Sequence, residues 1–239
     1  MGRFVIGMET SGAVRDAIRA LGHDCLSVDL LAHQHGGPHH EGDLFAFLDR
    51  DSAFDGGVFH PECTYHTLSA AWAFGPGPYH QRTQPGTLTG EARKAARAKA
   101  EADVERIKAL PFPKIIENPR GTLSTRTSLG PAHQVVQPYE FGSDASKATC
   151  FWFFDAEGRP IPHLRLPVDP AARVPGRWVT MPDGRRVERW ANQSDGGQNR
   201  LTPGPDRWKV RSDTYPGIAA ALAEAITRHH DRPQWSLVA

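Results

Sequence analysis

Short apolar runs alternate with an amphipathic stripe at the start of the chain, and this alternation constrains the fold more than any other feature. The run Phe4–Met8 predicts a buried strand. A helix is predicted next, because apolar residues recur at helical spacing at Val14, Ala17, Ile18 and Leu21. Gly22 is a typical helix end signal. A second strand is predicted over residues 25–31. Because two strands joined through a helix form a parallel pair with a right-handed crossover, the chain opens as an α/β protein.

The same alternation continues along the chain. We predict further strands over residues 54–60, 114–117, 135–136 and 150–154, and helices over residues 91–110 and 214–230. Alternating strands and helices favour a doubly wound, mostly parallel, Rossmann-like sheet. Residues 155–211 show no clear period and are rich in Pro, Gly and Arg. We therefore expect a small irregular lobe there, with residues 1–154 and 212–239 together forming the main domain.

Composition excludes several classes of protein. The chain has 239 residues, of which 39% are hydrophobic and 23% charged, unlike a disordered protein. It contains no apolar run of about 18 residues, so no membrane span is expected. Its 3 cysteines do not suit a disulfide framework and fit a reducing compartment. We expect a cytoplasmic protein that acts as a monomer.

Charge is unevenly distributed along the chain, although the net charge is only +1. Residues 159–211 carry 11 Lys and Arg against 5 Asp and Glu, whereas residues 1–158 carry 15 against 19. The basic segment also holds three tryptophans, at Trp178, Trp190 and Trp208. Arginines interleaved with aromatic side chains are typical of nucleic-acid binding, and the acidic part suits a cationic ligand. A solvated surface rich in arginine is the alternative interpretation.

The loop after the first predicted strand reads Glu9-Thr10-Ser11-Gly12 and lacks the G-x-G-x-x-G pattern of dinucleotide sites. Glu9 would repel a pyrophosphate and favours a ligand with a positive group, such as S-adenosylmethionine. Asp29 ends the second strand, where a carboxylate binds ribose hydroxyls. Asp43 ends another short strand candidate and is placed to accept from an adenine amine. Acids at three successive strand ends therefore predict a nucleoside-type ligand.

A thiol and a carboxylate follow at the next two strand ends. Cys63 lies in the polar segment His60–Tyr65, whereas the other two cysteines lie in apolar strand candidates, where free cysteines usually pack. A nucleophilic thiol needs a pKa below about 8.5, which a helix N-terminus or a cationic ligand favours and Glu62 opposes. Glu117 ends the following strand. The pair suits attack on an electron-poor ring carbon with protonation of a ring nitrogen. The alternative is that Glu117 caps the next element and that Cys63 has no functional role.

A series of short motifs runs through most of the chain in a fixed order: Ile6–Gly12, Gly22–Asp24 leading to Asp29, Gly42–Asp43, His60–Tyr65, Ile116–Pro119, Gln137–Gly142, Lys147–Cys150, Trp190–Gln193, Gly197–Leu201 and Arg211–Ala219. Together they resemble cytosine-5 DNA methyltransferases, in the compact form common in phages and prophages. The resemblance implies an S-adenosylmethionine-dependent methyltransferase fold. It also implies methylation of cytosine C5 in DNA through a covalent bond between Cys63 and C6, with Glu117 at N3 and the exocyclic amine.

The resemblance further assigns roles by position, and the charge of Glu9 adds this residue to the cofactor site. S-adenosylmethionine is expected to contact Thr10, Ser11, Gly12, Asp29, Asp43 and Pro61. The flipped or single-stranded cytosine is expected to lie near Glu62, Asn118, Lys147 and Thr149. Residues 155–211 become a target-recognition lobe whose phosphate contacts are expected from Arg185, Arg186, Arg189, Arg200, Arg207 and Lys209. The last helix is expected to fold back beside the first loop.

Two positions depart from the larger enzymes of that family. Glu62 stands where they place a proline before the nucleophile, and Lys147-Ala-Thr-Cys150 stands where they carry an arginine pair. The short lobe leaves open an enzyme that modifies C5 of a free pyrimidine nucleotide or transfers a group other than methyl. A DNA-binding protein with a decayed methyltransferase fold is the non-enzymatic alternative.

No metal site is predicted. Four histidines share one Gly- and Pro-rich loop, at His33, His35, His39 and His40, but no cysteine pair accompanies them. Their irregular spacing favours a polar loop over a zinc site. The expected partner is DNA, as a duplex with a flipped cytosine or as a single strand, and no membrane partner is expected.

Overall fold

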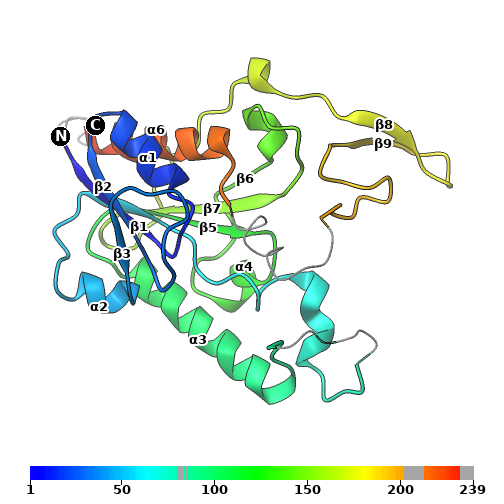
Figure 1. Cartoon of the computed structure of the whole chain (residues 1–239), viewed down its shortest axis with the longest axis horizontal. Coiled ribbons are helices and arrows are strands. Elements are labelled where there is room, and N and C mark those ends of the chain that lie inside the picture. Colours follow the sequence, from blue (N-terminus) through cyan, green and yellow to red (C-terminus); the bar gives the residue numbers. More distant parts are fainter. Residues whose placement is uncertain (80–82, 84–85, 202–212, 232–239) are drawn as a thin grey trace.

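The apolar runs of the sequence become the central strands of one seven-stranded sheet. The computed structural model describes residues 1–79, 83, 86–201 and 213–231 (Figure 1). The strands of this sheet, in chain order, are β1 (Arg3–Gly7), β2 (Asp24–Asp29), β3 (His39–Glu41), β4 (Gly56–Phe59), β5 (Lys114–Pro119), β6 (Gln134–Val136) and β7 (Thr149–Phe154). Their spatial order is β3-β2-β1-β4-β5-β7-β6.

The first five strands run parallel, and β7 runs antiparallel to both of its neighbours, β5 and β6. The fold is therefore α/β with a mostly parallel mixed sheet, compatible with a Rossmann-like fold, as the alternation of strands and helices predicts. The second strand was predicted to reach Leu31, and this was wrong. The Leu31 N–H donates to Asp29 Oδ1 at 2.9 Å, so the chain turns away from the sheet after Asp29. Leu30 and Leu31 are therefore exposed.

Helices and 3-10 turns connect the strands. The α-helices are α1 (Ala13–Ala20), α2 (Leu44–Leu48), α3 (Gly90–Lys108), α4 (Leu123–Arg126) and α6 (Pro216–Asp231). The 3-10 helices are η1 (Leu68–Phe74), η2 (Pro138–Phe141) and η3 (Pro170–Ala172). The three long helices lie where the apolar periodicity predicts them. The sequence analysis missed α2 and α4 because segments of 5 and 4 residues are too short to show a helical period.

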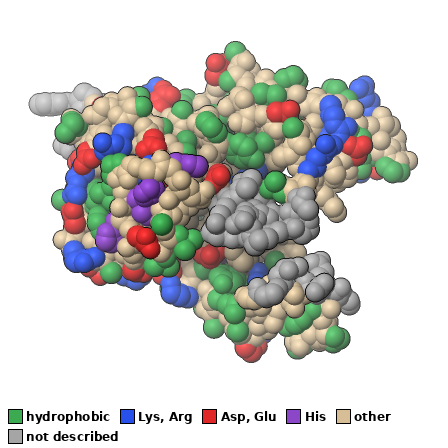
Figure 2. Space-filling view, viewed as in Figure 1, with side chains coloured by type: hydrophobic (Ala, Val, Ile, Leu, Met, Phe, Trp, Pro, Cys, Tyr) green, Lys and Arg blue, Asp and Glu red, His purple; other side chains and the backbone are tan. Residues whose placement is uncertain are grey.

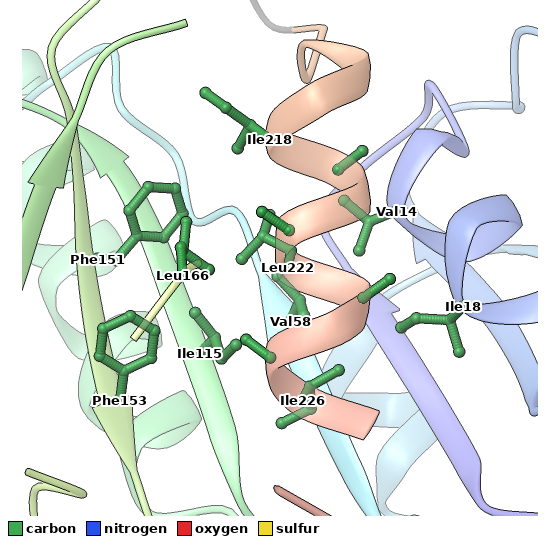
Figure 3. Packing of buried hydrophobic residues seen from close by; sticks show 14 of the residues in the cluster. Val14, Ile18, Val58, Ile115, Phe151, Phe153, Leu166, Ile218, Leu222 and Ile226 are labelled. Atoms are coloured by element: carbon green, nitrogen blue, oxygen red, sulfur yellow. The ribbon is translucent and has the colours of Figure 1, made fainter. Parts of the chain in front are cut away.

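Helices cover both faces of the sheet, as doubly wound folds require. On one face α1 and α6 pack over β1, β4, β5 and β7 (Figure 3). Leu222 and Ile226 of α6 lie in this core with Val14 and Ile18 of α1, and all four are fully or almost fully buried. On the other face α2 and α3 cover the same strands, with Val104 and Ile107 buried. Burial on both faces leaves the strand ends as the place for polar side chains.

The segment expected to be an irregular lobe contains regular structure. Strands β8 (Arg177–Thr180) and β9 (Arg186–Arg189) pair antiparallel as a hairpin that extends away from the main sheet (Figure 1). Most of the side chains of this hairpin are exposed or half-buried, so it shows no apolar alternation for sequence analysis to detect. The stretch before the hairpin packs with the main core through Ile161, Leu164 and Leu166. The lobe was expected to begin at residue 155, but the first part of that segment packs into the core of the main domain.

One aromatic stack joins the segment after the hairpin to η2, which follows β6. The rings of Trp190 and Tyr139 lie parallel with their centroids 3.9 Å apart. Nearby, the Asn192 side chain accepts from the Ser146 N–H at 3.0 Å and donates to the Ser146 carbonyl at 2.9 Å. Within the part of the chain that is described, no helix is long and apolar enough to cross a bilayer.

The packing of α6 predicts a large stability effect at Leu222. Leu222→Ala removes a fully buried side chain from between α1 and the sheet, so we expect the free energy of unfolding to fall by about 2–5 kcal/mol. Urea denaturation followed by circular dichroism measures it. Arg228→Ala, on the exposed side of the same helix, is the control and should cost less than about 1 kcal/mol. Equal losses for both variants would contradict this packing.

Candidate active site

The ends of four neighbouring parallel strands bring the predicted site residues to one edge of the sheet. Strands β2, β1, β4 and β5 are adjacent in that order, and the chain order reverses between β1 and β4. Glu9–Gly12 follow β1, Asp29 ends β2, Cys63 follows β4 and Glu117 lies near the end of β5. In open α/β sheets, ligands bind in the crevice outside such carboxyl ends, at the point where the order reverses. This edge is therefore the candidate site.

The loop after β1 is closed by its own acidic side chain. Glu9 is buried, and its carboxylate accepts from the Gly12 N–H at 3.0 Å and from the Ser11 hydroxyl. Thr10 accepts from Gln34 through its hydroxyl and its carbonyl, both at 3.0 Å. Gly12 has a φ of 73°, and a Cβ there would meet the buried Arg15 guanidinium. Glu9 thus holds the loop in shape and also contributes negative charge to this edge.

Several carboxylates at this edge act on one another. Burial raises the pKa of Asp29, the Leu31 N–H opposes the rise, and the charges of Glu9 and Glu62 add to it. Burial also raises the pKa of Asp213, where Glu9 adds to the rise and His35 and Lys147 oppose it. The structure thus brings the loop after β1, the end of β2 and the start of the last helical segment into one acidic region. A cationic group would relieve this repulsion.

Asp43 has a structural use in the described chain. It precedes α2, and its Oδ1 accepts from the Ala46 N–H at 2.8 Å, which caps the helix. The side chain of Asp43 is exposed. Asp43 was predicted to end a strand, and this was wrong, because that strand, β3, ends at Glu41. The expected contact with an adenine amine is untested by this geometry and stays a prediction.

Cys63 is half-buried, and its surroundings favour the protonated thiol. Burial raises its pKa to about 11, the charges of Glu62 and Glu117 add to the rise, and Lys147 opposes it. The sequence analysis required a lowered pKa and named a following helix N-terminus as one source. The next helix, η1, begins only at Leu68, five residues after Cys63 in the chain. Opposition from Glu62, by contrast, was expected and is present. A change in the local charge is therefore needed before Cys63 becomes a thiolate.

Glu117 has a partner that the sequence analysis did not assign to the site. His60, the first residue after β4, places its Nδ1 3.1 Å from Glu117 Oε2. Burial raises the pKa of Glu117, but the hydrogen bond and charge of His60, together with Lys147, more than offset it, and the net direction is downward. The sequence signal that could have identified His60 was its position. His60 and Glu117 come at the carboxyl ends of β4 and β5, which are paired.

Asn118 ties the two strand ends together. It is 1% exposed, and its side-chain amide donates to the Pro61 carbonyl at 2.8 Å. Its Oδ1 is buried and has no hydrogen-bond partner among the described residues. Both Asn118 and Pro61 were predicted site residues, one for the substrate and one for the cofactor. The structure brings them into contact next to Cys63 and Glu117, where they hold the loop after β4 against β5.

A buried arginine, missed by the sequence analysis, supports the same loop from α3. The Arg93 guanidinium donates to the Thr64 carbonyl at 2.8 Å and lies over the rings of Tyr65 and Phe74. It is 2% exposed. An arginine within an Ala-rich helix gives no sequence signal for such a role, because only packing reveals which face of α3 meets the loop. Arg93 therefore restricts the backbone that directly follows Cys63.

A small pocket lies beside Glu117. It is lined by residues from β5, the loop before β7, β7 itself and the start of α6, namely Glu117, Lys147, Thr149, Asp213, Thr214, Tyr215 and Ile218. Lys147 and Thr149 are predicted substrate residues, and the structure brings both to Glu117. The residues just before α6 and Ile218 in its first turn thus line the pocket. Asp213 and Tyr215 were missed as site residues. Glu62, which is exposed, accepts at 2.8 Å from the Thr64 N–H.

The predicted phosphate-binding arginines lie on and around the hairpin. Arg185 is exposed and pairs with Asp183 at 2.7 Å. The exposed Arg186 guanidinium lies 5.2 Å from the ring centre of Trp178, which is 59% exposed. Figure 2 shows Lys and Arg side chains gathered over this hairpin. An exposed tryptophan next to arginines is a surface on which bases and phosphates can both bind.

The remaining predicted phosphate contacts are less uniform. Arg189 donates through Nε to the Asp195 carbonyl at 2.9 Å, which uses part of its guanidinium within the lobe. Arg200 is exposed. Arg207 and Lys209 lie outside the described residues. Among the described residues that line the pocket at Glu117, none is Arg185, Arg186, Arg189 or Arg200.

The four histidines were predicted to share one loop, and this was wrong, because His39 and His40 lie in strand β3. Two of the four rings form described hydrogen bonds. His39 pairs with Ser27 Oγ at 2.8 Å and with the Leu31 carbonyl at 3.0 Å. His33 Nδ1 accepts from the Gly36 N–H at 2.8 Å. In residues 1–79, 83, 86–201 and 213–231, no three His, Cys, Asp or Glu side chains are grouped to hold a metal ion. These hydrogen bonds indicate a structural role for His33 and His39.

Comparison with protein-family models and with curated proteins finds no match to this chain. The site is therefore interpreted from its own geometry.

The charges around Cys63 predict how its reactivity depends on pH. Because only the thiolate is alkylated, reaction with iodoacetamide should be slow at pH 8 and rise toward the thiol pKa of about 11. Glu62→Gln removes a charge that raises this pKa, so its alkylation at pH 8 should be faster. Glu62→Asp keeps the charge and is the control. Mass spectrometry locates the label, and a wild-type midpoint at or below pH 8.5 would contradict the description.

Proposed function

We propose that this protein methylates cytosine C5 in DNA, with S-adenosylmethionine as the methyl donor. The observation that carries the proposal is the placement of Cys63 and Glu117 at the carboxyl ends of adjacent parallel strands, β4 and β5, where the charge of Glu117 raises the pKa of Cys63. A thiol and a carboxyl group in this relation suit addition to C6 of a pyrimidine with proton transfer at N3.

The residues of the cofactor edge fit S-adenosylmethionine. Gly12 lets the backbone of the first loop approach a ligand closely, and Asp29 ends the neighbouring strand at the position suited to ribose hydroxyls. The carboxylates of Glu9, Asp29 and Asp213 repel one another and would be relieved by a sulfonium. When bound, S-adenosylmethionine supplies an electrophilic methyl group. The residues of this chain hold it and orient it toward the pyrimidine.

Covalent chemistry begins at Cys63. The Cys63 thiol loses its proton to the Glu117 carboxylate, the sulfur forms a bond to C6, and the electron pair of the C5–C6 bond moves into the ring while Glu117 passes that proton to N3. C5 then takes the methyl group, water accepts the C5 proton, and the thiolate leaves as the C5–C6 double bond forms again and the N3 proton returns to Glu117. Because the free thiol has a pKa of about 11, ligand binding has to activate it. A bound cation near Glu62 and Glu117 would lower that pKa.

The hairpin supplies a surface for DNA in this proposal. Trp178 and Arg186 offer a ring and a guanidinium to bases and phosphates, and Arg185 adds a second charge. The target cytosine has to leave the duplex or come from a single strand before C6 can meet Cys63. The alternatives are a free pyrimidine nucleotide as substrate, a transferred group other than methyl, and a non-catalytic DNA-binding protein.

Transfer of a labelled methyl group from S-adenosylmethionine to unmodified duplex DNA tests the reaction. We expect wild-type protein to produce cytosines that resist bisulfite conversion in a short recurring context. Cys63→Ala should abolish transfer, and Glu117→Gln should lower kcat by about 100-fold or more because it removes a proton donor. Cys25→Ala, a buried cysteine of β2, is the matched control for loss of a thiol and should retain transfer where folded.

Outcomes other than methylated DNA separate the alternatives. Transfer to deoxycytidine nucleotides but not to DNA would favour the nucleotide enzyme. Tight DNA binding without S-adenosylmethionine binding would favour the non-catalytic protein. Full activity of Cys63→Ala would sink the covalent mechanism.

Salt dependence tests the hairpin. Removing two phosphate contacts with Arg185→Ala/Arg186→Ala should weaken duplex binding and reduce the slope of log K against log salt by about 0.9 per lost contact. Lys94→Ala/Lys99→Ala on α3 removes the same charge from two exposed lysines paired with acids of their own helix, and it should leave the slope unchanged. Fluorescence anisotropy at several salt concentrations measures both. Equal slopes for the two double variants would exclude the hairpin as the contact surface.

A further inference from the structure

His60 and Glu117 form a buried pair at the centre of the candidate site. Their side chains are 11% and 15% exposed, and Nδ1 lies 3.1 Å from Oε2. A ring nitrogen next to a carboxylate oxygen at this distance donates its N–H. The other ring nitrogen, Nε2, is buried and has no hydrogen-bond partner among the described residues. The only described hydrogen bond of the imidazole is therefore directed at Glu117.

The imidazole serves the carboxyl group rather than the thiol. The charges that act on the Cys63 thiol are those of Glu62, Glu117 and Lys147. His60 acts on Glu117 by both a hydrogen bond and its charge, and Lys147 faces the same carboxyl group. Asp213 and Tyr215, which precede α6, line the pocket beside it. A triad in which the histidine deprotonates the cysteine is therefore not the arrangement of this site.

We propose that His60 is a positioning residue that fixes which oxygen of Glu117 carries the proton during cytosine methylation. The inference rests on the proposed function. Because Oε2 accepts from Nδ1–H, the proton of the acid form is held on Oε1. The carboxyl group then presents a donor, Oε1–H, beside an acceptor, Oε2. Cytosine presents the complementary pair, with N3 as the acceptor and the exocyclic amine as the donor.

The proton balance of this step closes within the site. Glu117 rests as a carboxylate because His60 lowers its pKa, so the proton that it gives to N3 is the one that the Cys63 thiol loses. As the sulfur bonds to C6, this proton passes through Oε1 to N3, and Glu117 is a carboxylate again. The hydrogen bond from His60 stabilises the charge that then appears on Oε2. When the thiolate leaves C6, the proton returns from N3 to Oε1. His60 keeps its own proton throughout, so no further acid, base or oxidant is required for this exchange.

Two substitutions separate the hydrogen bond from the charge. His60→Asn keeps an amide N–H near the position of Nδ1 but cannot be charged, and His60→Ala removes both. In the full chain labelled with 13C at the glutamate carboxyl carbon, the Glu117 resonance is identified by its loss in Glu117→Gln. We expect the titration midpoint of Glu117 to rise in both variants, and to rise further in His60→Ala, because the hydrogen bond and charge that lower its pKa are lost.

Kinetics supply the second measurement. We expect kcat for methyl transfer to fall about tenfold or more in His60→Ala and by less in His60→Asn, with KM for S-adenosylmethionine unchanged. The pH at which kcat/KM changes should move upward with the Glu117 midpoint. His66→Asn is the matched control, because His66 is another buried histidine of this loop whose Nδ1 faces the Thr122 hydroxyl. It should leave the Glu117 titration unchanged.

The two proposals fail in different ways. If Glu117 titrates alike in wild type, His60→Ala and His60→Asn while methyl transfer proceeds, the positioning role is overturned and the proposed function stands. If the midpoint moves as expected but no methyl group is transferred to DNA, the pairing stands and the proposed function fails. An equal fall in kcat for His60→Ala and His66→Asn, with no shift of the midpoint, would reduce His60 to a structural residue.

Discussion

Burial of the parallel strands on both faces is the constraint on which the rest of the structure depends. Because α1 and α6 cover one face and α2 and α3 the other, β1, β4 and β5 have no solvent-facing surface for polar chemistry. Polar side chains then gather where these strands end, and parallel strands end at the same edge. The candidate site is thus a consequence of the layer order, and the long separation in sequence between Glu9, Cys63 and Glu117 is closed by strand pairing alone.

The electrostatics of that edge set its resting state. The carboxylates at Glu9, Asp29, Glu62 and Glu117 give it a negative character that suits a cationic ligand. Burial, together with the charges of Glu62 and Glu117, also raises the pKa of the Cys63 thiol. One feature therefore serves two purposes in the proposed function, since the ligand whose charge the edge attracts is also the group that would release the thiolate.

The site is held together by contacts between residues that are far apart in the sequence, and the sequence motifs do not reveal these contacts. Asn118 with Pro61 fixes the loop after β4, Arg93 holds the same loop from α3, and His60 orients Glu117. None of these contacts is visible as a spacing in the sequence. The lobe shows the same limit, because the Trp190–Tyr139 stack and the exposed hairpin produce no apolar period, although both decide where the basic side chains lie.

The sequence by itself determined the α/β class, the central strands, the three long helices and the gathering of Glu9, Asp29, Cys63 and Glu117 at one edge, because periodicity and chain order report burial and parallel pairing. It did not determine the end of β2, the short helices, the hairpin, or the partners of the site residues. Those depend on hydrogen bonds and packing between distant segments. Only the tertiary structure decided that the thiol rests with a raised pKa and that the carboxyl group beside it is paired with His60, because both follow from which charges are brought together.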